Sequence, residues 1–162
     1  MCRTRNAQPT DRSNRRLTVG PINRSVVSLR VMGDSLDPDE ISALLGIEPT
    51  LGYRKGDTRL TRHGKEVVHR AGLWSLDVQD KTPEDLNGQI AEILGQLTQD
   101  LSIWRALASR YRIDFFCGLF MEDSNEGVTL APATLRAAAE RGIEMGLDIY
   151  APDDSDGEPT GT

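Results

Sequence analysis

The sequence feature that most constrains the fold is one apolar run, residues 111–121, which reads YRIDFFCGLFM and contains all three phenylalanines of the chain. Its aromatic content and the turn residues that follow it favour a β-strand over a helix. Alternate side chains of a strand point to opposite faces, so Ile113, Phe115 and Cys117 share one face while Asp114 and Phe116 share the other. The run is too short to cross a membrane as a helix. We therefore interpret it as the central strand of a sheet.

Other stretches alternate apolar and polar residues with the period of a strand. They cover residues 26–32, 73–78 and 147–151, and the last is expected to turn Leu147 and Ile149 inward. Residues 128–130 are expected to return beside 116–121 as a hairpin. A further hairpin is predicted between residues 58–61 and 66–69, with its tip at 62–65.

Helix signals lie between these strands. Asp37 is a predicted N-cap followed by Pro38 at the first helical position, and Gly46 ends that helix. Thr82 and Pro83 predict the start of a second helix, which a turn or two at residues 101–109 extends. A third begins at Pro132, with Leu135, Ala138 and Ala139 expected to face inward.

This pattern predicts an α+β fold, a two-layer sandwich. It consists of a mostly antiparallel sheet of four to five strands with three helices on one face. The other face would be partly open to water. Its expected charged residues are Arg30, Asp77, Arg112, Asp114 and Asp148.

Both ends of the chain differ in composition from its middle. Residues 1–24 hold six arginines against one aspartate, and residues 152–162 hold four acids and no apolar residue. Neither segment has enough apolar surface to offset the entropy of ordering, so a disordered basic head and a disordered acidic tail are expected. The single folded domain is predicted at 25–151.

Charge and cysteine content narrow the class of protein. The formal net charge is −6, and the predicted domain alone carries −7, which argues against general nucleic-acid binding. No apolar signal segment or membrane-spanning run is found. The chain has only two cysteines, Cys2 and Cys117, so a disulfide framework is not expected. We expect a reduced, cytoplasmic protein. The sequence carries no signal for the oligomeric state.

The letters Gly33-Asp34-Ser35-Leu36 match the nucleophile motif of a large esterase family. A serine nucleophile needs a base, and that family supplies it as a late histidine, whereas nothing after residue 73 here is a histidine. The sequence therefore favours a strand-to-helix turn over an active site. A Ser35-dependent ester hydrolase stays as an alternative.

Metal and cofactor sites are not expected either. The acids at positions 34, 37, 39 and 40 are explained by the start of a helix, which favours negative charge. His63 and His69 lack cysteine partners at zinc spacing. No phosphate-binding glycine loop or dinucleotide fingerprint is present.

The basic segment 53–70 differs most from its surroundings, with a net charge of +4 inside an acidic domain. We select Arg54, Lys55, Asp57 and Arg59 as candidate binding residues for an anionic partner, such as an acidic protein surface. The alternative is a solvent-exposed hairpin without a binding role, whose positive charges balance the negative charge of the rest of the domain. Together with the lack of a complete catalytic set, the segment favours a non-enzymatic, immunity-like binding module over an enzyme. A small-molecule sensor using the open sheet face is a third hypothesis.

Several motifs occur in an order that resembles an uncharacterised bacterial family, the domain of unknown function numbered 4279. They are Gly33–Ile41, Leu44–Thr50, Lys55–Asp57, Gly72–Leu76, Phe116–Phe120 and Gly146–Tyr150. The resemblance implies a small single-domain α+β protein and no known activity, so it assigns no site residue. One departure is Ala131, where a serine-like cap is expected before Pro132.

Overall fold

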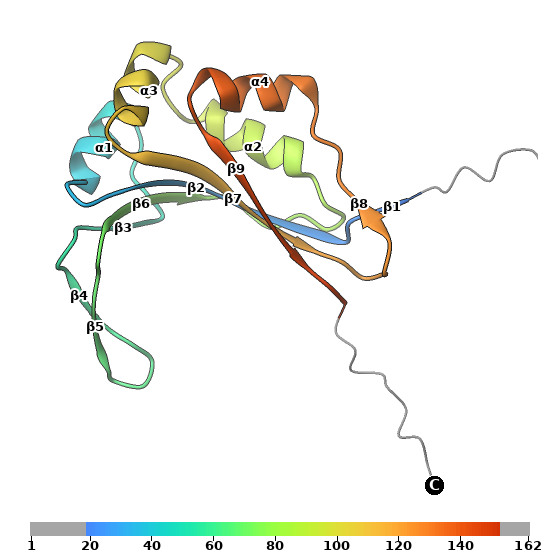
Figure 1. Ribbon diagram of the computed structural model, residues 1–162, viewed down its shortest axis with the longest axis horizontal. Coiled ribbons are helices and arrows are strands. Elements are labelled where there is room, and N and C mark those ends of the chain that lie inside the picture. Colours follow the sequence, from blue (N-terminus) through green and yellow to red (C-terminus); the bar gives the residue numbers. More distant parts are fainter. Residues whose placement is uncertain (1–18, 153–162) are drawn as a thin grey trace, which may run out of the picture.

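The computed structural model describes residues 19–152. A sheet of five strands lies under a layer of four helices, as Figure 1 shows, so the predicted two-layer α+β class is confirmed. The helix count is four because residues 101–108 form a helix of their own. The elements are β1 Gly20–Pro21, β2 Arg24–Gly33, α1 Pro38–Leu45, β3 Leu51–Tyr53, β4 Thr58–Leu60, β5 Glu66–Val68, β6 Gly72–Asp77, α2 Leu86–Gly95, α3 Leu101–Ala108, β7 Arg112–Phe120, β8 Glu126–Gly127, α4 Pro132–Glu140 and β9 Glu144–Tyr150.

The strand order of the main sheet is β3-β6-β2-β7-β9. All neighbours are antiparallel except β7 and β9, which run parallel and are connected through α4. The middle strand is therefore β2, and the predicted central strand β7 lies next to it. The alternation predicted for β7 holds on the helix side, where Phe115, Cys117 and Leu119 are fully buried. On the other face Phe116 is half-buried.

The core fills the space between the sheet and the helices. Trp74 of β6 and Trp104 of α3 are both fully buried. Each indole satisfies its N–H group: Trp74 donates to Ser42 Oγ at 3.1 Å, and Trp104 donates to the Thr98 carbonyl at 2.9 Å. Both tryptophans are thus core residues whose polar atom has a partner.

The helix boundaries follow their caps. The Asp37 side chain accepts the Asp39 N–H, and Gly46 ends α1 with φ 88°, so both predictions for α1 are confirmed. The prediction for α2 is wrong, because its N-cap is Asp85 and not Thr82. Lys81, just before the predicted cap, exchanges two backbone hydrogen bonds of 3.0 Å with Ser25 and is held in an extended conformation.

The segment after β7 also differs from its prediction. Residues 128–130 form no strand, and β8 instead pairs in parallel with β1. The start of α4 has no side-chain cap on Ala131, as expected. Asn87 of α2 compensates, because its Oδ1 accepts the Ala131 N–H at 2.9 Å and the Thr134 hydroxyl at 2.7 Å.

Two apolar predictions near the end of the domain are wrong. Leu147 and Ile149 of β9 lie on the helix-facing side but stay 39% and 60% exposed, because no helix covers this end of the edge strand. In α4, Leu135 is 46% exposed and Ala139 is exposed, whereas Thr134 and Ala138 are buried. The prediction for Ala138 is thus confirmed, whereas those for Leu135 and Ala139 are wrong.

The folded region extends further toward the N-terminus than residue 25. Ile22 is 2% exposed, its carbonyl accepts the Glu84 N–H, and Gly20–Pro21 forms β1. The rest of the predicted head, residues 1–18, and most of the predicted tail lie outside the described residues.

Candidate functional site

The basic segment forms a hairpin that projects beyond the main sheet, which we call the basic arm (residues 54–70). Strands β4 and β5 pair antiparallel, with Thr58 opposite Val68 and Leu60 opposite Glu66, which confirms the predicted hairpin. Figure 1 shows the arm extending away from the helix layer. At its tip, Thr61 and Lys65 close the turn through a backbone hydrogen bond of 2.8 Å.

Two of the four predicted binding residues fasten the base of the arm. Arg54 bonds Asp37 and, at 2.7 Å, Asp39, while Lys55 forms an ion pair with Asp34. The bond to Asp39, followed by the one to Asp37, raises the pKa of Arg54. The cations of the arm base and the acids at the start of α1 therefore satisfy each other. For Arg54 and Lys55, the ion pairs agree with the alternative in which the positive charges of the segment balance acidic residues of the same domain.

The third predicted residue, Asp57, shapes the turn into β4. Its carboxylate accepts the Arg54 N–H at 2.7 Å, and its carbonyl accepts the His69 N–H at 2.8 Å. Gly56 provides the left-handed conformation that this turn needs, with φ 91°. Asp57 thus acts on the direction of the arm.

The fourth predicted residue, Arg59, lies over a hollow of about 380 Å³ where the arm meets the sheet. Tyr53 and His69 also line the hollow, and their rings are stacked with centroids 3.5 Å apart. Asp57 also lines the hollow, so the structure brings these two predicted residues together. Arg59 is exposed and takes part in none of the ion pairs among residues 19–152.

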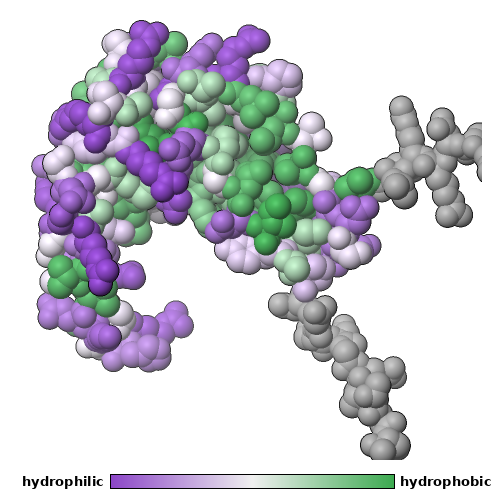
Figure 2. All heavy atoms as spheres, in the orientation of Figure 1, coloured by the Kyte–Doolittle hydropathy of each residue, from purple (hydrophilic) through white to green (hydrophobic). Residues whose placement is uncertain are grey.

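More cations without ion pairs follow along the arm. Like Arg59, the residues Arg62, Lys65 and Arg70 are exposed and form none of the ion pairs in the described part of the chain. Figure 2 shows the arm as largely hydrophilic with a small apolar area. Leu60 and Val68 are 74% and 56% exposed and share one face of the hairpin. Sequence reasoning missed these two residues, although their alternation in a hairpin with no helix to cover it was a usable signal.

The open face of the main sheet contains an ion pair whose carboxylate is buried and whose arginine is partly exposed. Arg30 of β2 donates from Nε and Nη2 to the two oxygens of Asp114 on β7, at 2.8 and 2.9 Å. The Asp114 side chain is 2% exposed, and its bond to Arg30 raises the pKa of that arginine. Arg112 adds a contact of 3.6 Å to Asp114 and bonds Glu144 at 3.1 Å. Arg30, Asp114 and Arg112 on this face therefore bind one another, whereas Asp77 and Asp148 are exposed and form none of the ion pairs among residues 19–152.

Ser35, the nucleophile of the alternative hypothesis, is exposed in the turn between β2 and α1. The hydrogen bonds found among residues 19–152 include none from the Ser35 hydroxyl to an imidazole. His69 is stacked on Tyr53, and His63 lies at the exposed tip of the arm. The geometry thus brings no base to Ser35.

Residues 19–152 contain no group of three or more histidine, cysteine or acidic side chains that would hold a metal ion. None of the helices in that range has the length and apolar character needed to cross a bilayer.

Comparison with known proteins identifies one family. A family model described as a domain of unknown function (DUF4279) matches residues 22–152, which is nearly the whole described region and confirms the resemblance seen in the motifs. No curated protein and no solved structure matches the chain significantly.

Proposed function

The chain belongs to the DUF4279 family of domains of unknown function, and on that premise we propose that it is a non-enzymatic, immunity-like module whose basic arm docks on an acidic surface of a partner protein. The observation that carries this proposal is that one projecting hairpin combines two exposed apolar side chains with exposed cations that form no ion pair among residues 19–152. The key residues are Arg59, Arg62 and Lys65 with Leu60 and Val68.

The apolar pair argues for a protein partner. A two-stranded hairpin is only marginally stable in water without a second layer, and β4 and β5 have none. Leu60 and Val68 share one face of the hairpin and are suited to the core of a small interface, with the cations of the arm tip, Arg62 and Lys65, at its rim. This matches the usual anatomy of protein–protein contacts. A partner that covers them would also hold the hairpin in one conformation.

The charges argue for an acidic surface. The arm carries +4 within a chain of net charge −6, so it is a local positive region on a negative molecule. Such a region attracts an acidic patch over distances of about a Debye length, roughly 8 Å at physiological salt. The acidic remainder of the chain would repel the same patch elsewhere and so orient the encounter.

The fixed base of the arm supports recognition. Arg54 and Lys55 bind the acids near the start of α1, and Asp57 sets the turn, so the arm is oriented before a partner arrives. An oriented element loses less entropy on binding than a free loop. Arg54, Lys55 and Asp57 therefore contribute by positioning, and Arg59, on the opposite face of the hairpin from Leu60, contributes its charge to the attraction of the partner.

The test is a pull-down from the native host with the wild type and the variant Arg59→Glu/Arg62→Glu. We expect the variant to lose the partner captured by the wild type, and the wild-type complex to weaken steeply as salt rises above about 0.15 M. A Leu60→Ser/Val68→Ser variant keeps every charge, and it should lose the same partner.

The matched control is Arg105→Glu/Arg136→Glu, which changes the net charge equally at exposed positions of α3 and α4. It should capture the partner as the wild type does. An identical catch for the wild type and the arm variant would show that the arm is not the docking element.

A further inference from the structure

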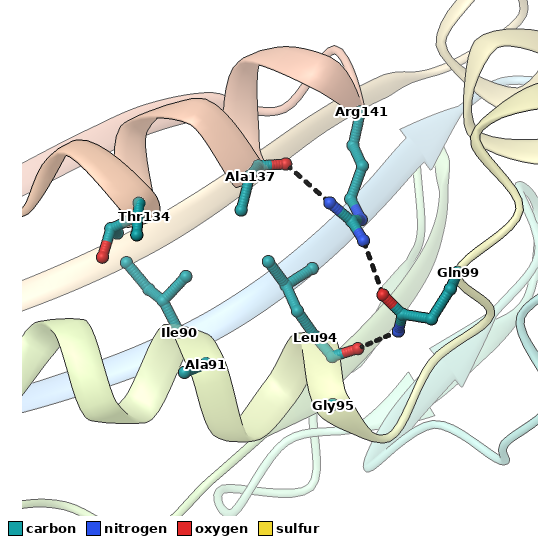
Figure 3. A pocket seen from close by; sticks show the side chains of 9 residues that line it. Ile90, Ala91, Leu94, Gly95, Gln99, Thr134, Ala137 and Arg141 are labelled. Carbon is teal, nitrogen blue, oxygen red and sulfur yellow. Dashed lines mark hydrogen bonds between the residues drawn. The ribbon is translucent and has the colours of Figure 1, made fainter.

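A groove in the helix layer is lined by residues of α2 and α4. Figure 1 shows these two helices away from the basic arm, so a ligand bound there would be separate from the partner proposed above. The volume of the groove is about 510 Å³, within the range of small-molecule sites. Figure 3 shows its two walls and, at one end, the guanidinium of Arg141. The walls are mainly apolar or small and include Ile90, Ala91, Leu94, Ala133 and Ala137.

Arg141 is a buried cation that has no acidic counter-ion among residues 19–152. Its residue exposure is 7%, and no acidic residue in the described region forms an ion pair with it. The guanidinium makes two hydrogen bonds to neutral acceptors, the Ala137 carbonyl at 3.1 Å and Gln99 Oε1 at 2.8 Å. Its Nε is buried and has no hydrogen-bond partner. A guanidinium has five N–H donors, so most of its donor capacity stays unused.

Gln99 fixes the orientation of this guanidinium. Its Nε2 donates to the carbonyls of Leu94 and Leu97, at 2.9 and 2.7 Å, so its oxygen must face Arg141. The Gln99 amide is held by two backbone carbonyls, and the guanidinium donates to two acceptors. These bonds hold the charged group at the end of the groove (Figure 3). The arginine is therefore pre-positioned.

An unpaired buried charge is costly, and buried arginines in proteins are normally paired with an anion. The planar fork of a guanidinium matches a carboxylate, which it can bind through two parallel hydrogen bonds. Because the remaining wall is apolar, the bound molecule would need both an anionic group and an apolar body.

We propose that the groove between α2 and α4 binds a small amphipathic carboxylate, whose carboxylate pairs with Arg141 and whose apolar part lies against Ile90, Leu94 and Ala137. The ligand is a free small molecule of the fatty-acid type. An isolated inorganic anion would leave the apolar walls unused, and a purely apolar molecule would leave the cation unpaired.

The experiment titrates the full chain with decanoate, below its micelle concentration, and follows backbone amide shifts by NMR. We expect saturable binding with shifts concentrated in α2, α4 and residues 97–99. Decanol, which has the same chain without the charge, should bind at least tenfold more weakly. Equal affinity for decanoate and decanol, or no saturable binding of decanoate, would overturn the proposal, and so would inorganic phosphate that binds this groove as tightly as decanoate.

Three variants locate the site. Arg141→Gln should weaken decanoate binding at least tenfold, and Arg136→Gln, at an exposed position of the same helix, should leave it unchanged. Ala137→Leu keeps Arg141 and fills the groove, so it should weaken decanoate and decanol alike. This second variant keeps the test valid if Arg141→Gln alters the fold, and wild-type affinity in Ala137→Leu would refute the proposed location.

Discussion

At the scale of single residues, the most consequential side chain on the open sheet face is Asp114. Its carboxylate is almost fully buried and accepts two hydrogen bonds from Arg30, which is itself about one third exposed. We expect Asp114→Ala to lower the free energy of unfolding by about 2–3 kcal/mol, the upper range for hydrogen bonds to charged groups. Asp148→Ala, at an exposed position of the same face, should change it by less than about 0.5 kcal/mol. Urea denaturation measures both, and equal effects would contradict this role for Asp114.

Cys117 gives a prediction about reactivity. Burial raises the pKa of its thiol to about 12, so the nucleophilic thiolate is scarce at neutral pH. In a Cys2→Ser variant, native protein should react with a thiol reagent at pH 8 far more slowly than urea-unfolded protein does. Because the folded pKa is the higher one, the thiol supports stability below about pH 8.5 and this support is lost as pH rises toward 12. Fast labelling of the native variant would show that the strand opens readily.

At the scale of elements, α4 starts without a cap of its own and depends on Asn87 of α2. Ala131 already has the extended conformation of an N-cap, with φ −68° and ψ 148°. Ala131→Ser should therefore raise the free energy of unfolding by about 1 kcal/mol. Ala133→Ser, inside the helix, adds the same hydroxyl without a cap and should lower it slightly. Thermal unfolding of the two variants checks the difference, and a shift of the same sign in both would contradict the capping argument.

The elements also show what local sequence can and cannot predict. Three features depend only on residues close together in the chain and were predictable: the cap of α1, the hairpin of the arm and the alternation in β7. The start of α2 was not, because Lys81 is held by Ser25 of a distant strand. The same holds for the candidate site: charge counting identified the basic segment, but only folding brings Asp34, Asp37 and Asp39 to Arg54 and Lys55.

At the scale of the whole molecule, the position of the N-terminal boundary of the folded domain can be tested through the melting temperature. Residues 1–18 and 153–162 have compositions that argue against packing, so a chain reduced to 19–152 should melt within a few degrees of the full chain. A chain reduced to 25–152 also loses buried Ile22 and β1. Removal of one buried isoleucine side chain alone costs about 2–5 kcal/mol. We expect the shorter chain to melt at least about 5 °C lower, and equal melting temperatures of the two would show that β1 and Ile22 do not contribute.

Strand order at this scale was not predictable from the alternation of side chains. Alternation shows which face a residue occupies, but not which strand lies beside which. The run at 111–121 is the most apolar of the chain, yet it is not the middle strand. The middle strand is β2, because it pairs with β6 on one side and with β7 on the other, and one further strand lies beyond each of them. The exposed apolar residues of β9 were mispredicted for a related reason, because helix coverage depends on where α4 ends above the sheet.

The central place of β2 has a consequence for synthesis on the ribosome. This strand is among the first parts of the fold to be made, yet its partner residue for Arg30 is Asp114, 84 positions later. Until β7 emerges, a nascent chain can pair β2 with β6 only, and one edge of its middle strand remains open to other chains. Contacts this distant in sequence also slow folding after release. A growing chain arrested shortly before residue 112 is therefore the species in which a chaperone has the most exposed strand edge to protect.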